Sequence, residues 1–410
     1  MIVLGIETSC DETAAAVVQD GNILLSNVVA SSMDLHKAYG GVVPEIAARS
    51  HVESILPVID EAVSVVGWDQ IDAIAVTYGA GLGGSLLVGV MTARTLAIVK
   101  NKPLYAVNHV HGHVAANFIT ETDLENYSLP NKQPEFPLIA LIVSGGHTQL
   151  VYFRSMFDYA LLGKTRDDAI GEAFDKVAKI IGLPYPGGPS IFSTAKNGDA
   201  QKYNFPKAKL SPLKNPRDNG LDGVQGNNEQ RMIRTYSTES EPRKQMTQQS
   251  AKSTSSVSIY DRKQDSAASD SRYEFSFSGL KTAVLRLAQS EIGEDFTFPS
   301  KALPEKLSEA QKADISASFQ RIAIETVVDK AVKACMEFSP KSFVIAGGVA
   351  ANQELRKQLT EKLPIVPTYT DIKLCTDNGA MIAELGCLMA MSDQPTADPY
   401  SLDIQPNLSM

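Results

Sequence analysis

Two hairpin-like segments that lie far apart in the chain have the same pattern of apolar and polar residues. This repeat is the feature that most limits which folds these 410 residues can adopt. In the first, the apolar run LGIET leads into a polar turn at residues 9–13 and returns as AAAVV. In the second, LIALIV leads into SGGHT and returns as QLVYF. Small and polar residues at such tips let backbone N–H groups approach an anion. The repeated plan indicates a weak internal duplication, and chance similarity of two hairpins is the alternative.

The rest of the pattern mixes strands and helices. Apolar or alternating runs predict strands at residues 1–7, 14–18, 23–30, 71–77, 138–143, 149–153 and 342–346. Apolar residues at helical spacing predict helices at 44–66, 85–100, 168–181, 315–336 and 352–363. The fold class is therefore α/β, and the chain is longer than one core usually organises. We expect two lobes, residues 1–118 and 119–393, and a C-terminal tail at 394–410.

Residues 207–272 differ in composition from the rest of the chain. They are rich in Ser, Gln, Asn, Lys and Arg and poor in large apolar side chains, which predicts a disordered insertion in the second lobe. The stretch is basic, whereas the whole chain carries a net charge of −9. A solvated surface loop is the simpler interpretation, and an RNA-contacting arm is the alternative.

The composition also indicates in which cellular compartment the protein is found. The four cysteines are scattered without a CxxC pair, so neither a disulfide framework nor a cysteine zinc site is indicated. No run approaches the roughly 20 apolar residues of a membrane-spanning helix, and the first residues lack the pattern of a secretory signal. We expect a cytoplasmic protein with no membrane partner.

Half of the six histidines lie in the segment NHVHGHVAA. On a helix, His109 and His113 project from the same side, where two neutral imidazoles can bind one divalent ion, while His111 points elsewhere. A zinc peptidase of the HExxH type would need glutamate where Val110 stands. Ordinary hydrogen-bonded histidines are the alternative interpretation.

Two ligands are too few for a tight metal site, which usually takes three from the protein. Asp377, in LCTDNGAMIA, is the candidate for the third, because carboxylate oxygen commonly joins imidazoles around a metal. A polar turn opens an apolar helix at this point, so Asp377 suits a helix N-cap equally well. Spacing alone leaves both interpretations open.

Glycine pairs recur in SGG, PGGP and AGGV. Glycine permits close approach of the backbone to a nucleotide, and Asn352, at a helix start after the last pair, can hydrogen-bond a ribose or a base. The spacing is neither GxGxxG nor GxxxxGK[ST], so neither a Rossmann site nor a Walker loop is supported. Asp175, which follows Asp168 and Glu172 on one helical face, is a candidate acceptor for substrate hydroxyls, although acidic faces are usually solvated.

Eight ordered segments resemble the tRNA N6-adenosine threonylcarbamoyltransferase family, bacterial type, formerly called O-sialoglycoprotein endopeptidases. They are GIETSCDET, GGVVPEIAARSH, NHVHGH, VSGGHTQL, DDAIGEAFDKVAKIIGLPYPGGP, FSFSGLKT, GGVAANQELR and CTDNGAMIA. They cover nearly the whole chain apart from 207–272 and the residues after Met391. The resemblance implies an actin-like, Hsp70-like and sugar-kinase-like (ASKHA) fold with two related lobes, in agreement with the duplicated hairpins.

The resemblance also implies a reaction, the transfer of threonylcarbamoyl from threonylcarbamoyl-adenylate to N6 of adenosine 37 in tRNAs that read codons beginning with A, with release of AMP. By resemblance, His109, His113 and Asp377 hold one divalent metal per subunit, iron(II) with zinc as the alternative, which anchors the threonylcarbamoyl group. The family's substrate-binding positions match Ile142, Val143, Ser144, Gly145, Gly146, Asp175, Gly188 and Asn352. The general base stays open among Asp11, Glu12 and His147.

The partners implied are tRNA, the adenylate, a noncatalytic ASKHA paralogue and a P-loop ATPase. Three other functions are the alternatives. A small-molecule kinase of the same fold does not require the histidine pair with a distant aspartate, and a noncatalytic scaffold has no need to retain it. A metalloprotease would need a recognisable general base, which the segment lacks.

Overall fold

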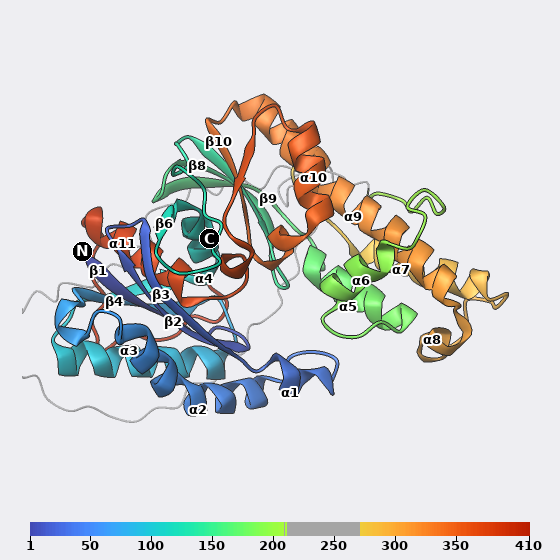
Figure 1. Ribbon diagram of the computed structural model, residues 1–410. Coiled ribbons are helices and arrows are strands. Elements are labelled where there is room, and N and C mark those ends of the chain that lie inside the picture. Colours follow the sequence, from blue (N-terminus) through green and yellow to red (C-terminus); the bar gives the residue numbers. More distant parts are fainter. Residues whose placement is uncertain (209, 211–270) are drawn as a thin grey trace, which may run out of the picture. The chain divides into compact units, whose positions relative to one another are not determined.

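The computed structural model describes residues 1–208, 210 and 271–410 (Figure 1). Most of the predicted insertion at 207–272 lies outside the described residues, so its disorder stays a prediction. The strands of the described part form two sheets. The first has the order β5 (Leu104–Asn108), β4 (Ala73–Gly79), β1 (Ile2–Glu7), β2 (Glu12–Gln19), β3 (Ile23–Ser31) and β6 (Glu121–Thr122). The second has the order β11 (Pro367–Tyr369), β10 (Ser342–Ala346), β7 (Leu138–Val143), β8 (Thr148–Ser155) and β9 (Asp158–Lys164).

The two sheets share one topology. In the first, β1, β2 and β3 are antiparallel neighbours, and β4 and then β5 pair in parallel on the other side of β1. In the second, β7, β8 and β9 are antiparallel, and β10 and then β11 pair in parallel on the other side of β7. Strand order and direction therefore repeat element by element. The α/β class is confirmed, and the two similar hairpins start the two repeats.

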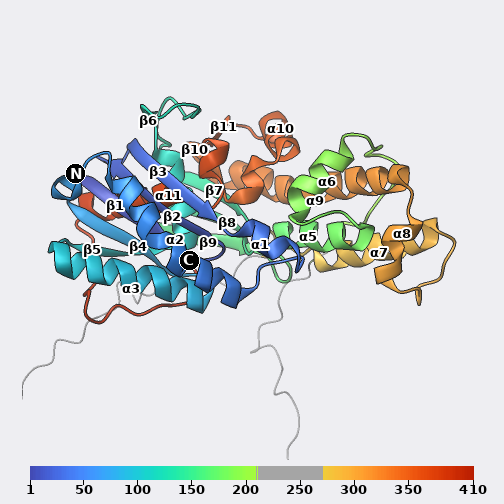
Figure 2. The same ribbon diagram turned by 60° about the horizontal axis from the view of Figure 1, so that its bottom comes forward.

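Helices cover the sheets. The first sheet packs against α2 (Pro44–Val63) and α3 (Gly83–Lys100), which lie along one face of it (Figure 2). The second contributes Ile139, Leu141 and Val143 to a core shared with α5 (Ile170–Ile181), α7 (Ser278–Glu291) and α9 (Glu309–Phe338). The remaining helices are α1 (Met33–Lys37), α6 (Gly187–Ala195), α8 (Leu303–Lys306) and α10 (Gln353–Lys362), with 3-10 turns at Trp68–Gln70, Ala116–Phe118, Ser300–Ala302, Gly348–Ala351 and Ile372–Leu374.

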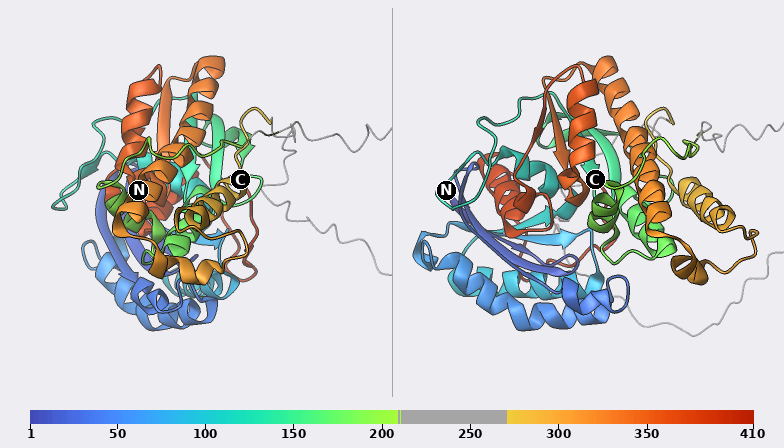
Figure 3. Two further views of the ribbon diagram at one scale, coloured as in Figure 1. Left: turned by 90° about the vertical axis from the view of Figure 1, so that its right-hand side faces the viewer. Right: turned by 45° about the vertical axis from the view of Figure 1, so that its right-hand side comes forward.

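Two helices that matter for the site, α4 (His109–Ala115) and α11 (Gly379–Met391), share one core with residues of both sheets (Figures 1 and 3). α11 packs on β1, β2, β4 and α4. The approach is very close, because a side chain at Gly5 would meet the backbone of Ala383 and one at Gly379 would meet the backbone of Ala15. Glycine at these two positions therefore allows the start of α11 to lie beside α4. The predicted boundary between lobes stays a prediction, although this helix, from the second half of the chain, packs on the first sheet.

One helix of the described residues, α3, has the length and hydropathy of a membrane span. It packs against β4, β5 and α2, and its buried side chains include Leu86, Val90 and Ala97. Contact with the first sheet accounts for part of its apolar composition, while Leu87, Met91 and Val99 of the same helix are exposed.

The predicted elements differ from the observed ones in identifiable places. The seven predicted strands and five predicted helices are present; β7 and β10 match the predicted bounds, and the other elements have one or both ends shifted. The helix α9 extends further than predicted at both ends, since a capping box of Ser308 and Gln311 starts it at Glu309. Strands β5, β6, β9 and β11 were not predicted. Each lies toward or at a sheet edge and is short or only partly apolar, so its pairing depends on neighbours distant in sequence.

Candidate metal centre

The two histidines of the predicted pair lie on the short helix α4. Asn108 ends β5 and caps the helix, its side-chain oxygen accepting the N–H groups of Val110 at 2.9 Å and His111 at 3.2 Å. The rings of His109 and His113 lie 4.7 Å apart, edge to face. His111 points the other way, among Phe153, Phe157 and Tyr159. His109 and His113 thus project from one side of the helix and His111 from another, as the helical spacing predicts.

Asp377 lies next to α11 without capping it. The cap of α11 is Asn378, whose side chain accepts the N–H of Met381 at 3.0 Å. The carboxylate of Asp377 faces the two imidazoles instead, with Oδ1 3.3 Å from Nε2 of His113 and 3.6 Å from Nε2 of His109. Of the two interpretations that spacing left open, N-cap and third ligand, the geometry removes the first.

The three donor groups fit one divalent ion. One ligand atom from each residue lies within 4.8 Å of the others. Ligands about 2.1 Å from a tetrahedral ion are about 3.4 Å apart, close to the two distances to Asp377. Both ring nitrogens of His113 are buried without a hydrogen-bond partner among the described residues, which is costly unless another group occupies one of them. Two imidazoles and a carboxylate suit iron(II) or zinc.

Attraction between opposite charges stabilises the cluster of His109, His113 and Asp377. Burial lowers the pKa of His109, but the negative charges of Asp377 and Glu7 outweigh it and raise that pKa to about 9. Burial raises the pKa of Asp377, yet His109 and His113 hold it well below its usual range. The side chain of Asp377 keeps 21% of its surface exposed, so the centre is open on one side.

Glu7, the last residue of β1, completes the surroundings of His109. The Nδ1 atom of His109 lies 3.0 Å from Oγ of Ser9 and 3.2 Å from Oε2 of Glu7. Thr77, on the neighbouring strand β4, donates its hydroxyl to the same carboxylate oxygen at 2.6 Å. Glu7 is wholly buried.

The turn between β1 and β2 is held by its backbone carbonyls. The carbonyl of Cys10 lies 3.0 Å from Nε2 of His51 and accepts the hydroxyl of Ser85 at 3.2 Å. The carbonyl of Asp11 accepts the N–H and the hydroxyl of Ser32, at 3.0 and 2.8 Å. Side chains from α2, α3 and the end of β3 therefore fix the path of residues 9–13 beside the candidate metal centre.

Two of the three candidate bases, Glu12 and His147, interact electrostatically with the cluster. Burial raises the pKa of Glu12 to about 9, with the charges of Asp377 and Asp11 adding to the effect. Burial lowers the pKa of His147 to about 4, and the positive charges of His109 and His113 lower it further. The charges of the cluster therefore act on one residue from each hairpin tip.

The second hairpin tip supplies the predicted glycine cradle. Ile142 and Val143 have fully buried side chains, while Gly145 and Gly146 are exposed, with open space where a side chain would stand. Ser144 accepts the N–H of His147 through its hydroxyl at 3.1 Å. The exposed backbone of residues 145–146, and not the side chains of the strand before it, is therefore what a substrate can reach.

The remaining predicted substrate residues already have protein partners. Asp175 accepts the N–H of Gly187 at 2.7 Å, which joins α5 to α6, and Gly188 beside it faces open space. Asn352 caps α10 with its oxygen and donates its amide to Gln320 at 3.1 Å. Of the acidic face, Asp168 and Glu172 both pair with Lys176 at 2.7 Å. Direct contact of these residues with a substrate stays a prediction.

Similarity to known proteins agrees with the site. The model of the TsaD family, described as tRNA N6-adenosine threonylcarbamoyltransferase, matches residues 23–224 and 219–384. The tRNA N6-adenosine threonylcarbamoyltransferase of Thermomicrobium roseum is 41% identical over 419 residues, which cover 100% of this chain and 97% of the relative. The chain belongs to this family. The enzyme of the same name from Caldicellulosiruptor saccharolyticus is 40% identical over 415 residues, covering 100% of this chain and 98% of the relative.

As a member of the threonylcarbamoyltransferase family, the protein is a transferase that modifies tRNA. The crystal structure of HypF from T. kodakarensis is similar in fold, with a TM-score of 0.51 and 13% identity over 95% of this chain and 48% of that chain. The predicted ASKHA fold is confirmed by this likeness and by the repeated sheet topology.

Several residues around the threonylcarbamoyltransferase site were not predicted from the sequence. Glu7 ends the buried strand β1, Thr77 lies inside the buried strand β4, His51 lies in a long amphipathic helix, and Tyr185 follows α5. Burial raises the pKa of Tyr185, and the charges of Asp175 and Asp11 raise it further. A polar residue at the end of an otherwise apolar strand was the one available signal.

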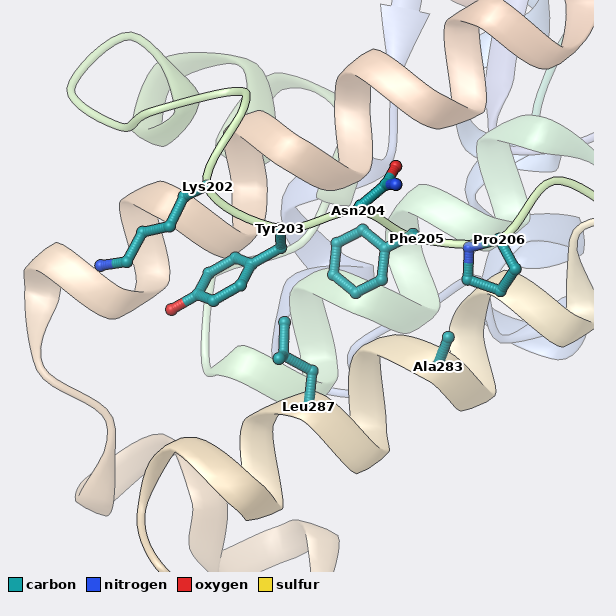
Figure 4. Close-up of a pocket in the computed structure, with 7 residues that line it drawn as sticks. All are labelled: Lys202, Tyr203, Asn204, Phe205, Pro206, Ala283 and Leu287. Carbon is teal, nitrogen blue, oxygen red and sulfur yellow. The ribbon is translucent and has the colours of Figure 1, made fainter.

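A separate hollow of about 300 Å³ lies between residues 202–206 and α7 (Figure 4). The side chains of Tyr203, Phe205 and Leu287 face it, and Lys202 at its edge pairs with Asp314 at 2.6 Å. None of the predicted site residues lines this hollow.

Proposed function

We propose that this transferase moves the threonylcarbamoyl group from threonylcarbamoyl-adenylate to N6 of adenosine 37 in tRNAs that read codons beginning with A. The N6 nitrogen attacks the carbamoyl carbon, a C–N bond forms, the C–O bond to phosphate breaks, and AMP leaves with the bonding electrons. A proton passes from N6 to a base. The observation that carries the proposal is the convergence of His109, His113 and Asp377 in a member of this family.

We further propose that these three residues hold iron(II), with zinc as the alternative. When bound, a divalent ion supplies Lewis acidity that polarises the threonylcarbamoyl group. The chain itself supplies orientation. The exposed backbone of residues 145–146 and the open side of Gly188 are suited to the adenylate, and the first hairpin tip borders its phosphate. Because the anhydride is already activated, positioning and electrostatic stabilisation account for the catalysis.

The base is one of Asp11, Glu12 and His147. Asp11→Asn, Glu12→Gln and His147→Ala variants separate them when kcat, KM and metal content are measured together. The base is the residue whose removal lowers kcat and leaves KM and metal content unchanged. A residue that positions the substrate raises KM, and one that supports the centre lowers metal content.

The proposal includes protein partners, a noncatalytic ASKHA paralogue and a P-loop ATPase, and a cytoplasmic location. Support for a protein partner comes from the outer face of α2 and α3. Val52, Leu56, Leu87 and Met91 are 47 to 64% exposed there, and a groove of about 410 Å³ runs between the two helices. Exposed apolar patches of this kind mark protein interaction surfaces.

The deciding experiment reconstitutes the reaction. Purified protein loaded with iron(II) or zinc is incubated with synthetic threonylcarbamoyl-adenylate and unmodified tRNA, with and without the partners, and the nucleoside is identified by mass spectrometry. Modified adenosine 37 and stoichiometric AMP are expected. Absence of product with every metal and every partner combination would contradict the proposal.

A further inference from the structure

The Glu7 carboxylate lies behind the candidate metal centre, on the side of His109 away from Asp377. Glu7 is wholly buried, and its one charged neighbour among the described ion pairs is His109. One carboxylate oxygen accepts the backbone N–H of Ser9, and the other accepts the hydroxyl of Thr77 at 2.6 Å. This second oxygen also lies 3.2 Å from Nδ1 of His109. Glu7 is thus held in place by a donor from the turn after β1 and a donor from β4.

An ionised carboxylate can only accept hydrogen bonds, so a proton must lie on Nδ1 of His109 for the contact to be favourable. Metal binding requires the ring to lose its other proton, which leaves the lone pair on Nε2, the atom 3.6 Å from Asp377. Both carboxylate oxygens accept hydrogen bonds from N–H or O–H donors, an arrangement that favours the ionised form of Glu7.

We propose that Glu7 is a positioning residue that fixes the tautomer and the ring orientation of His109 for metal binding. The inference rests on the proposed metal site. Carboxylates that accept the second N–H of a metal-binding histidine raise the basicity of the ligand and hold its ring. His113 has no such partner, since its Nδ1 makes no hydrogen bond among the described residues. The two histidines therefore differ, and His109 is the pre-oriented ligand.

The hydroxyl of Ser9, 3.0 Å from the same Nδ1, does not provide this selection. A hydroxyl both donates and accepts, so it can satisfy either tautomer of His109. The carboxylate can accept a hydrogen bond only from the tautomer of His109 that carries a proton on Nδ1. Exchange of Glu7 for the uncharged glutamine, which can donate as well as accept, therefore removes the selection while keeping the shape, whereas loss of the Ser9 hydroxyl leaves it intact.

The test measures Co²⁺ affinity of the full-length protein by competition with a chromophoric chelator, together with the visible spectrum of bound Co²⁺ and the Tm of the metal-free protein. We expect Glu7→Gln to weaken Co²⁺ binding by about 10- to 100-fold and to change the spectrum. Ser9→Ala should bind Co²⁺ nearly as well as the unaltered protein. Equal Co²⁺ affinity and an unchanged spectrum in a folded Glu7→Gln variant overturn the inference.

Thr77→Val is the second variant, for use if Glu7→Gln does not fold. It removes the hydroxyl that holds the carboxylate oxygen facing His109 and leaves the charge in place. Weaker Co²⁺ binding with an unchanged Tm supports the positioning role, and unchanged binding contradicts it. If the unaltered protein binds no Co²⁺, the proposed metal site itself fails, so the two failures are distinguished.

Discussion

Nε2 of His113 lies 3.3 Å from Oδ1 of Asp377, although α4, which carries His113, and the turn before α11, which carries Asp377, are far apart in the chain. Asn378 takes the capping position of α11 and leaves the carboxylate beside it available. A metal bound here would replace the direct contacts between imidazole and carboxylate.

Replacement of Asp377 by asparagine should therefore remove the metal. Asparagine keeps the shape but lacks the charge that balances a divalent ion, and we expect metal affinity and transfer activity to fall by roughly 100-fold or more. Elemental analysis and product quantification check this. Asp393→Asn, an exposed change just beyond the other end of α11, is the control and should alter neither. Full metal content in Asp377→Asn would exclude this carboxylate as a ligand.

The burial of the Glu384 carboxyl group leads us to predict an unusual dependence of stability on pH. It is wholly buried in α11, neither carboxylate oxygen has a hydrogen-bond partner among the described residues, and burial raises its pKa to about 8. The ordinary value is 4.5, so the unfolded chain loses this proton first. The free energy of unfolding should be highest below pH 4.5 as far as this group is concerned, and should fall as the pH rises to about 8.

The effect at pH 8 amounts to several kcal/mol, on the order of 1.4 kcal/mol for each unit of pKa difference. Glu384→Gln should flatten the slope of Tm against pH between 5 and 8 and stabilise the protein at the alkaline end. Glu361→Gln, on the exposed side of α10, should leave the slope as it is. A slope that is the same in Glu384→Gln and the unaltered protein would show that Glu384 is not the group responsible.

The exposed face of α2 and α3 predicts where a partner protein binds. Leu56 is 62% exposed beside the apolar groove, and Val99, at the end of α3, is 71% exposed outside it. A lysine at position 56 places a charge in an apolar interface, so Leu56→Lys should weaken copurification of the partner at least about tenfold. Val99→Lys should not. Both variants should keep the Tm of the unaltered protein, and equal partner recovery from both would rule out this face.

Contacts at the two ends of the insertion at 207–272 lead us to predict that most of it can be removed without loss of stability. Lys207 pairs with Glu325 and Asp329 at 3.1 and 2.6 Å, and Arg272 pairs with Glu337 at 3.1 Å, so both ends are tied to α9. These partners are spaced over about 18 Å of helix, which roughly six to eight extended residues can span. A chain with a short Gly/Ser linker in place of residues 211–270 should keep its Tm and the salt dependence of tRNA binding. A smaller salt slope would instead favour the basic arm.

Local patterns predicted the parts of the site that depend on local geometry. The helical spacing of His109 and His113 was sufficient to place both on one side of α4. For Asp377, the sequence could not choose between capping and coordination, because the choice depends on which of two adjacent side chains turns back to Met381. Glu7 went unnoticed since its partners, His109 and Thr77, come from other elements. The repeated hairpins predicted the repeat in the fold. The edge strands were not predicted, because they depend on pairing with strands that are distant in sequence.

The close packing of α11 on the first sheet has a consequence for how the protein is made. Both histidines leave the ribosome well before Asp377 does. A product that stops before residue 377 carries the imidazoles and lacks the carboxylate as well as the helix that lies against β1. The proposed three-ligand site can therefore form only after residue 377 has been synthesised, and tight metal retention should distinguish chains that include α11 from shorter fragments.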